Sequence, residues 1–326
     1  MQPFESIDVK DRVIGRSSVT VSELGFGAAP IGNLYTAISD DEARATVDAA
    51  WDAGMRYFDT APHYGLGLSE RRLGSALSRY ARDDYVVSTK VGRLLVPNPA
   101  PTGSDLLSGL FDVDDSLTRQ LDYSPDGVRR SLDESLERLG LDRIDIVLVH
   151  DPVDFMDSVI ADTIPALIRL RDQGVIGAVG IGMNLWEPLR RAVMETDIDV
   201  VMIAGRWTLL DRSAAPLLDA CEQNDCSVLA AAPFNSGLLA QRWPQAGSRF
   251  DYGPASDEVL ERARAIAAAC NANGASLPQA ALQFPLRHPS VASVVAGMGT
   301  AGQVTENAAL LAGPVTEAAW DSIAGA

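Results

Sequence analysis

The chain has 326 residues, of which 47% are hydrophobic, and its formal net charge at pH 7 is -17. This acidic balance argues against nucleic acid or an anionic membrane as a partner, because both require clustered Lys and Arg. No linker-like or low-complexity stretch divides the chain, so we expect a single domain over residues 1–326.

The three cysteines, Cys221, Cys226 and Cys270, are an odd number, and the first residues contain no apolar signal segment. Both features predict reduced thiols in a cytoplasmic protein. No apolar run approaches the ~20 residues of a membrane span. Cys221 and Cys226 have no histidine or third cysteine nearby in sequence, so we expect no metal site.

Short apolar runs alternate with amphipathic helical stretches along the chain. Residues 12–21 predict an N-terminal β-hairpin that turns at 15–18. Eight strand-then-helix units follow. The predicted strands are 24–28, 57–59, 85–90, 144–150, 178–183, 200–204, 227–231 and 290–296. The predicted helices are 41–53, 69–79, a helix opening at 124–125, 158–173, 186–195, 214–223, 257–273 and 303–311.

Strands that alternate with helices predict a parallel sheet. Eight units in about 300 residues favour a closed (β/α)8 TIM barrel of the α/β class, with an open doubly wound sheet as the alternative. Two long loops, 92–123 and 239–254, interrupt the pattern. Loops of this length are commonly lids, so we expect both to roof a substrate pocket.

Polar residues end three successive predicted strands: Asp59 the second, Lys90 the third and His150 the fourth. Tyr64 lies in the loop just after Asp59. The carboxyl ends of barrel strands meet at one mouth, so these four side chains should converge there. An isolated Asp–Lys pair is often structural, and a histidine at a strand end is often a core residue. Four such residues at successive strand ends favour a catalytic site.

The chemistry of this set is proton transfer to or from a carbonyl or carbinol oxygen. A tyrosine has an unperturbed pKa of about 10, so it needs a nearby cation that favours the phenolate. Lys90 supplies that cation, Asp59 holds it, and His150 directs the reacting oxygen by a hydrogen bond. The set contains no nucleophile, which makes hydrolysis less natural.

Three motifs carry a family resemblance: FDTAPHYGLGLSERRLG (58–74), VVSTKVG (86–92) and IDIVLVHDP (144–152). They resemble the aldo-keto reductases over essentially the whole chain. The resemblance implies a (β/α)8 barrel and a nicotinamide cofactor. It also implies that Asp59, Tyr64, Lys90 and His150 are the catalytic tetrad, with Tyr64 as general acid/base.

The resemblance also implies a cofactor site. Asn184 would hold the carboxamide, Trp207 would stack on the nicotinamide, and a loop after the seventh strand would cover the pyrophosphate. The turn 297–302 spells GxGxxG, but the chain ends too soon after it for a Rossmann unit. In this family that turn binds the adenosine end. The implied cofactor-binding residues are Gly27, Asp59, Asn184, Trp207, Pro233, Phe234, Ser236, Gly237, Leu238, Gly297, Met298, Gly299, Thr300, Gln303 and Asn307.

No Lys or Arg occurs after Arg287, so a 2′-phosphate would find no local counter-charge at this turn. We therefore predict NAD as the preferred cofactor, with NADP as a second possibility.

Further motifs (182–188, 204–212, 232–240 and 280–298) resemble the sugar-oxidising branch of the family. They imply oxidation of the anomeric hydroxyl of an aldose such as L-fucose, D-arabinose or L-galactose to a lactone. Pyridoxal, which also closes to a hemiacetal, is the alternative. We expect Tyr64, His150, His63 and Trp207 to line the substrate pocket. A general NADPH-dependent carbonyl reductase and a non-catalytic cofactor-sensing module are further alternatives, and the family resemblance permits a monomer or a homodimer.

Overall fold

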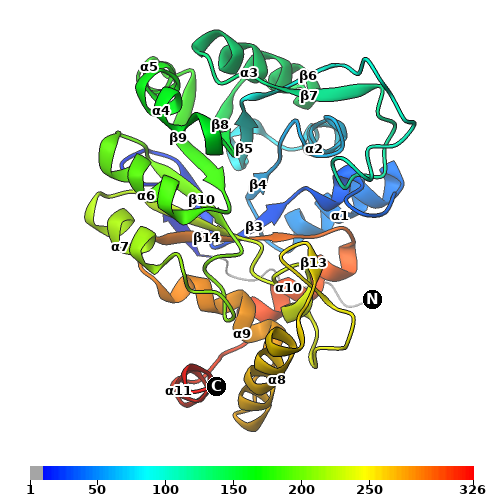
Figure 1. The fold of residues 1–326 in the computed structure, drawn as a ribbon, viewed down its shortest axis with the longest axis vertical. Helices are drawn as coiled ribbons and strands as arrows, with labels where there is room; N and C mark the ends of the chain where they lie inside the picture. The colour runs from blue at the N-terminus through cyan, green and yellow to red at the C-terminus, as the bar shows by residue number, and fades with distance from the viewer. Residues whose placement is uncertain (1–9) are drawn as a thin grey trace.

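The computed structural model describes residues 10–326, so the expectation about a signal segment concerns partly undescribed residues. Eight parallel strands close into a barrel, in which spatial order follows chain order and the last strand pairs with the first (Figure 1). The predicted barrel is confirmed, and the open sheet is excluded. The barrel strands are β3 (Leu24–Gly27), β4 (Tyr57–Asp59), β5 (Val86–Val91), β8 (Ile144–His150), β9 (Ile176–Met183), β10 (Val200–Ala204), β11 (Ser227–Ala231) and β14 (Val291–Gly297).

Helices surround the barrel (Figure 1). Local sequence explains where several of them begin. Ser39 and Glu42 form a reciprocal capping box at the first helix, and Ser124 caps the third with Pro125 in its first turn. The helices are α1 (Asp40–Asp52), α2 (Leu68–Leu77), α3 (Pro125–Leu139), α4 (Met156–Ser158), α5 (Ile164–Asp172), α6 (Trp186–Glu195), α7 (Ala215–Gln223), α8 (Asp257–Ala272), α9 (Leu277–Gln283), α10 (Ala301–Ala312) and α11 (Glu317–Ala324). A π-helical turn, Val159–Thr163, joins α4 to α5.

The predicted N-terminal hairpin is present, as β1 (Asp11–Val13) paired antiparallel with β2 (Thr20–Ser22). It closes the N-terminal end of the barrel. Ile14 is fully buried in the cluster that fills the barrel, together with Ile146 and Val200. At Gly15, whose φ is +49°, a Cβ atom would lie 2.4 Å from the carbonyl oxygen of Asp199, so only glycine fits this turn.

The two predicted lid loops contain strands that the sequence did not reveal. In the first, β6 (Arg93–Pro97) pairs antiparallel with β7 (Leu117–Leu121). In the second, β12 (Arg249–Phe250) pairs with β13 (Gly253–Pro254). The segments β6 and β7 lack the alternating apolar pattern of a strand with one buried face, because they lie outside the main core.

Helices α9 and α11 were also missed. A capping box between Ser276 and Gln279, with Pro278 in the first turn, marks the start of α9 and was a readable signal. Thr316 similarly caps α11.

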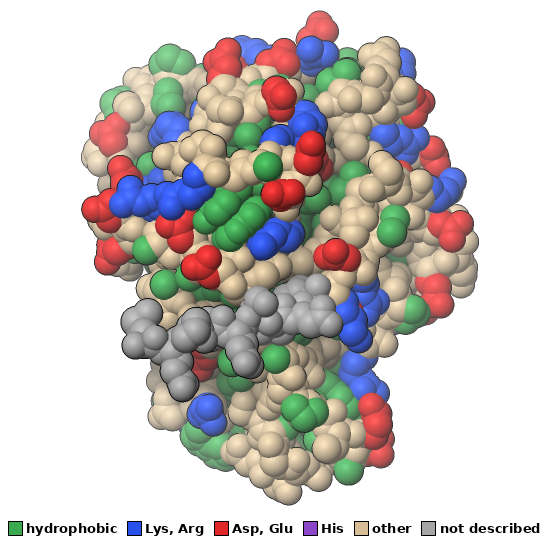
Figure 2. Space-filling view, turned by 180° about the vertical axis from the view of Figure 1, so that it is seen from behind, with side chains coloured by type: hydrophobic (Ala, Val, Ile, Leu, Met, Phe, Trp, Pro, Cys, Tyr) green, Lys and Arg blue, Asp and Glu red, His purple; other side chains and the backbone are tan. Residues whose placement is uncertain are grey.

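Seen from behind, the surface carries acidic and basic side chains intermixed (Figure 2). No helix within residues 10–326 combines the length and the apolar character that a membrane span needs.

Candidate active site

Three neighbouring strands deliver Asp59, Lys90 and His150 to the C-terminal mouth of the barrel. Asp59 is the last residue of β4, His150 is the last of β8, and Lys90 lies near the end of β5 between them. All three are buried, with 3%, 2% and 7% of their surface exposed. The predicted convergence of these side chains is therefore present in the structure.

Lys90 has an acceptor for each proton of its ammonium group. Its Nζ donates to Asp59 Oδ2 at 2.8 Å, to Asp59 Oδ1 at 2.9 Å and to the carbonyl oxygen of Thr60 at 2.9 Å. Burial alone would lower the pKa of Lys90, but Asp59 and Tyr64 together outweigh burial and raise it. Lys90 is therefore a fixed cation.

Asp59 is held from its other side by Ser88, whose hydroxyl donates to Asp59 Oδ1 at 2.7 Å. The hydroxyl of Tyr57 lies 2.9 Å from Ser88 Oγ and donates to it, because the Ser88 proton is already committed to Asp59. Sequence reasoning missed Ser88. Its signal was its place two residues before Lys90, on the same face of the strand.

Tyr64 lies above this pair, with Lys90 Nζ 4.7 Å from the centre of its ring. Burial raises the pKa of Tyr64, and Lys90 opposes that rise without cancelling it. The cation that we expected to favour the phenolate is in place, but in the free protein the phenol stays protonated at neutral pH. Tyr64 is therefore an acid first, and it becomes a base only as the pH rises.

His150 is a neutral imidazole. Burial, followed by the charges of Arg93 and Lys90, holds the pKa of His150 well below 6.5. Its Nδ1 is buried and has no hydrogen-bond partner within residues 10–326, whereas Nε2 lies 3.5 Å from Asp151 Oδ2. An acceptor near Nε2 favours the tautomer that carries its proton there. His150 thus offers a donor to the mouth.

The first lid loop places Phe111 beside His63, which lies in the loop between β4 and α2. The ring centre of His63 lies 5.6 Å from that of His150 and 5.4 Å from that of Phe111. Arg119, which pairs with Asp105 at 2.6 Å, donates to the carbonyl oxygen of His63 at 3.0 Å. Burial, with Arg119 and Arg93, lowers the pKa of His63 to about 2. The structure places this predicted pocket residue beside the tetrad.

Trp207 lies elsewhere. Its indole ring is 5.2 Å from the ring of Phe284 and 5.7 Å from that of His288, and Nε1 donates to the carbonyl oxygen of Pro285 at 3.4 Å. These partners precede β14, in the layer of helices outside the barrel. The predictions that Trp207 stacks on a nicotinamide and lines the pocket therefore disagree with the structure. The chain turns the indole outward directly after β10, which the sequence pattern does not reveal.

The loop after β11 has an unusual backbone. Ala232, Asn235, Ser236 and Gly237 all have positive φ, between 44° and 93°. Asn235 donates through Nδ2 to the carbonyl oxygen of Gly205 at 3.2 Å, while its buried Oδ1 has no partner within residues 10–326. A buried acceptor without a donor is a strained arrangement that a bound polar ligand would relieve. Asn235 was absent from the predicted cofactor residues, although its neighbours were included.

The second lid loop closes over this region. Arg206 donates to Asp251 Oδ2 at 2.9 Å and, through Nε, to the backbone oxygen of Asn184 at 3.2 Å. The N–H of Tyr252 donates to Ser236 Oγ at 2.9 Å. Arg206 therefore links the predicted carboxamide position, after β9, to the lid.

The glycine-rich turn follows β14 and opens α10. Thr300 caps this helix by accepting from the N–H of Gln303, and Gln303 Oε1 accepts from the N–H of Gly299 at 2.8 Å. Gly297, Thr300 and Gln303 are exposed, and the first turn of α10 carries no charged side chain. Gly27 pairs with both Gly297 and Asp59. This turn therefore lies on the mouth side of the barrel.

Among known proteins, the family model described as "Aldo/keto reductase family" matches residues 23–326. The chain belongs to this family. It is 49% identical to a D-threo-aldose 1-dehydrogenase of Pseudomonas sp over 95% of each chain, and 37% identical to a pyridoxal 4-dehydrogenase of Microbacterium luteolum over 96% of each. The holo form of aldo-keto reductase AKR11C1 from Bacillus halodurans matches 97% of this chain and 96% of its own, with a TM-score of 0.78 and 28% identity.

Membership confirms that the chain is a nicotinamide-dependent oxidoreductase, as the motifs predicted.

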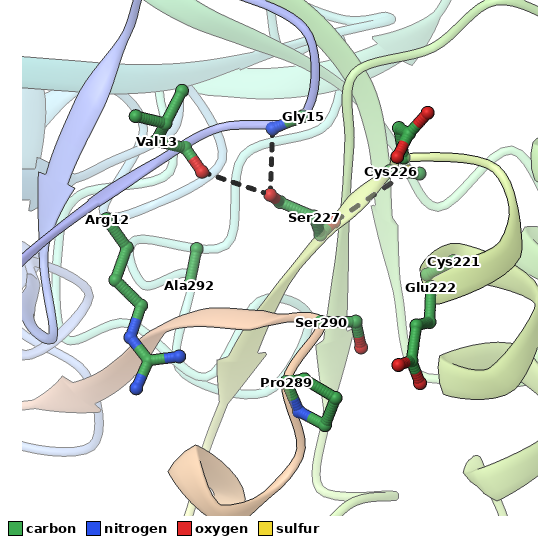
Figure 3. A pocket seen from close by; sticks show the side chains of 11 residues that line it. Arg12, Val13, Gly15, Cys221, Glu222, Cys226, Ser227, Pro289, Ser290 and Ala292 are labelled. Atoms are coloured by element: carbon green, nitrogen blue, oxygen red, sulfur yellow. Dashed lines mark hydrogen bonds between the residues drawn. The ribbon is translucent and has the colours of Figure 1, made fainter.

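A separate cavity of about 220 Å³ lies at the opposite end of the barrel, lined by Arg12, Gly15, Cys226 and Ser227 among others (Figure 3). Within it, the N–H of Gly15 donates to Ser227 Oγ at 2.8 Å. A hydrogen bond with Cys221, followed by burial, raises the pKa of Cys226 well above its ordinary value, which favours the thiol over the thiolate.

Proposed function

We propose that the protein oxidises the anomeric hydroxyl of an aldose to the lactone, with NAD as the preferred cofactor. The observation that carries the proposal is the buried Asp59–Lys90 pair beneath Tyr64, with a neutral His150 facing it. This arrangement suits proton transfer at one oxygen atom. The 49% identity to a D-threo-aldose 1-dehydrogenase supports the class of substrate.

In the proposed mechanism, the anomeric hydroxyl lies between Tyr64 and His150. The Nε2–H group of His150 donates a hydrogen bond to the reacting oxygen and fixes its direction. The phenolate of Tyr64 accepts the hydroxyl proton, and the ammonium of Lys90 stabilises that phenolate by its charge. Asp59 keeps Lys90 in place throughout. The bound nicotinamide supplies the hydride acceptor.

The residues around the mouth fit a dinucleotide. The N–H groups at the start of α10 and the left-handed backbone at Asn235, Ser236 and Gly237 suit phosphate groups. We propose that Asn184, Pro233, Phe234, Leu238, Gly297, Met298, Gly299, Thr300, Gln303 and Asn307 complete the site, beside Gly27 and Asp59. Trp207 does not belong to this set, because its ring faces the helical layer.

The preference for NAD rests on charge. Thr300 and Gln303 are the exposed polar side chains at the turn, and Glu306 lies in the next turn of α10. No Lys or Arg follows Arg287 in the chain. A dianionic 2′-phosphate would therefore meet helix amides and a nearby carboxylate, but no guanidinium or ammonium from this segment.

Pyridoxal is the second candidate substrate. The chain is 37% identical to a pyridoxal 4-dehydrogenase, and pyridoxal closes to a hemiacetal on which the same proton step would act. The edge-to-face pair of His63 and Phe111 offers an aromatic surface against which a pyridine ring would pack.

The test is turnover with L-fucose, D-arabinose, L-galactose and pyridoxal, each with NAD and with NADP, for the wild type and Tyr64→Phe. We expect lactone formation from an aldose with NAD, and a loss of about 10²–10⁴-fold in kcat for Tyr64→Phe. Full activity of Tyr64→Phe would refute the proton step. Higher kcat/KM for pyridoxal would establish the alternative substrate, and a tenfold preference for NADP would refute the cofactor proposal.

A further inference from the structure

Asp151, the residue after His150, is held in an unusual backbone conformation. Its φ is +45°, in the left-handed region that non-glycine residues rarely adopt. Its N–H donates to the carbonyl oxygen of Gly182 at 3.0 Å. The hydroxyl of Tyr123 donates to the carbonyl oxygen of His150 at 2.7 Å and lies 3.2 Å from that of Asp151, so it holds both residues. Because the surrounding structure fixes this strained backbone, the direction of the side chain is fixed with it.

The carboxylate of Asp151 is committed on one oxygen only. Oδ2 accepts from Arg93 Nη2 at 2.7 Å and lies 3.5 Å from His150 Nε2. Oδ1 has no hydrogen bond to any residue within 10–326, and 34% of the side chain is exposed. Arg93 itself comes from β6 of the first lid loop. Oδ1 of Asp151 is therefore available as a hydrogen-bond acceptor at the mouth, beside His150 Nε2, the atom proposed to bind the reacting oxygen.

This step rests on the proposed function, in which the substrate is a cyclic aldose. The hydrogen-bonding groups next to the anomeric carbon can then be compared with the Asp151 carboxylate. The anomeric carbon has two neighbours in the ring: the ring oxygen, which can only accept a hydrogen bond, and C2, whose hydroxyl can donate one. A carboxylate can only accept. With the anomeric oxygen on His150 Nε2, the group next to it that Asp151 can bind is the C2 hydroxyl.

We infer that Asp151 is a specificity-determining residue that accepts a hydrogen bond from the C2 hydroxyl of the aldose. This contact distinguishes the C2 side of the anomeric carbon from the ring-oxygen side. It therefore sets which way the sugar ring lies and which face of the anomeric carbon is turned to the hydride acceptor. In pyridoxal the ring carbon bonded to the hemiacetal carbon carries no hydroxyl, and the nearest hydroxyl is one ring carbon further away, so the contact would have a different geometry.

Three pentoses that differ only at C2 test the inference: D-arabinose, its C2 epimer D-ribose, and 2-deoxy-D-ribose. The variants are Asp151→Gly, which removes the carboxylate and tolerates the positive φ, and Asp151→Asn, which keeps a neutral acceptor. Asp154→Gly is the matched control, because Asp154 is exposed and has no side-chain hydrogen bond within residues 10–326. The readout is the ratio of kcat/KM between sugars, so a general loss of activity cancels.

For the wild type and Asp154→Gly, we expect kcat/KM for D-arabinose to exceed that for 2-deoxy-D-ribose by about 10–100-fold, as befits a hydrogen bond to a charged group. We expect the ratio to fall below about threefold in Asp151→Gly and to be intermediate in Asp151→Asn, because a neutral acceptor is weaker. The ratio of D-arabinose to D-ribose should fall in the same order.

An unchanged arabinose/deoxyribose ratio in Asp151→Gly would overturn the inference while leaving the proposed function intact. An equal loss on all three sugars would also overturn it and would make Asp151 a residue that only positions His150. If the wild type oxidises no aldose, the proposed function fails and the inference fails with it. Wild-type turnover of D-arabinose therefore separates the two.

Discussion

Charged groups are buried at both ends of the barrel, but their hydrogen bonding differs. At the N-terminal end, Asp199 accepts from Arg171 Nη1 at 3.0 Å and from the N–H of Val179 at 2.9 Å. Asp145 likewise accepts from Arg82 at 2.6 Å and from the N–H of Val87 at 2.7 Å. These carboxylates bridge neighbouring strands and stabilise their register.

At the mouth, the same kinds of group are left incomplete. The Nδ1 atoms of His63 and His150 and the Oδ1 of Asn235 are buried and have no partner within residues 10–326. One oxygen of Asp151 is also open. Arg93 Nε and Arg119 Nε, near His150 and His63, are also unpaired, whereas Arg82 Nε at the opposite end and Ser131 Oγ in α3 are the exceptions within residues 10–326. Buried polar groups without partners are destabilising, so their greater number at the mouth indicates where the fold gives up stability for binding and chemistry. The predictions below test this division.

Lys90→Met gives the largest expected effect. It removes the charge that stabilises the Tyr64 phenolate, and it leaves Asp59 buried without its counter-ion. We expect kcat for sugar oxidation to fall by about 10³-fold, within the range of general acid–base catalysis. The double variant Lys90→Met/Asp59→Asn should regain thermal stability, measured as Tm, but not kcat. Recovery of kcat in the double variant would contradict the role of Lys90.

The pH dependence of oxidation follows from Tyr64. Its pKa is raised by burial, so the phenolate that accepts the proton is a minor species at pH 7. We expect kcat/KM to rise by about tenfold per pH unit from pH 7 until the pKa of Tyr64 is reached, and then to level off. The pKa of His150 lies well below 6.5, so His150 stays neutral throughout and adds no limb in this range. A rate that falls above pH 7 would contradict Tyr64 as the base.

Cofactor choice offers a smaller and local change at the mouth. Gln303→Arg adds a guanidinium to the exposed first turn of α10, where the 2′-phosphate of NADP would lie. We expect kcat/KM with NADP to rise by about tenfold, the worth of one charge-assisted hydrogen bond. The matched control is Gln223→Arg, the same substitution at an exposed position in the last turn of α7. An equal gain in both variants would indicate a general charge effect on an acidic protein.

The barrel and the convergence of Asp59, Lys90 and His150 could be predicted from the sequence because both rest on local patterns. Asp59, Lys90 and His150 each end an apolar strand, and strand order in a barrel follows chain order, so their convergence could be read directly. Contacts between distant segments could not be read in this way. The pairing of β6 with β7, the lid contact between Arg206 and Asp251, and the outward turn of Trp207 depend on packing between segments without a periodic signal.

The pKa of Tyr64 shows the same limit for the site. The sequence supplied the tyrosine and the cation beside it, but the balance between burial and charge depends on the surrounding packing. Asp151 was visible as the residue after His150. Its role was not, because the sequence does not reveal a positive φ at a residue other than glycine or a carboxylate with one oxygen free.

Asp199→Asn tests the opposite end and should change activity least. Asp199 is 5% exposed and joins Arg171 to the N–H of Val179 at the start of the barrel strands, far along the chain from the tetrad. Replacing the carboxylate weakens two hydrogen bonds from the guanidinium of Arg171. Arg171 still donates through Nη2 to Asp197 Oδ2, at 2.8 Å. We expect a loss of about 2 kcal/mol in the free energy of unfolding and a Tm lower by a few degrees, with kcat within about twofold of wild type. A loss of kcat comparable to that of Lys90→Met, at unchanged Tm, would mean that the two ends of the barrel are coupled and that stability and chemistry are not divided between them.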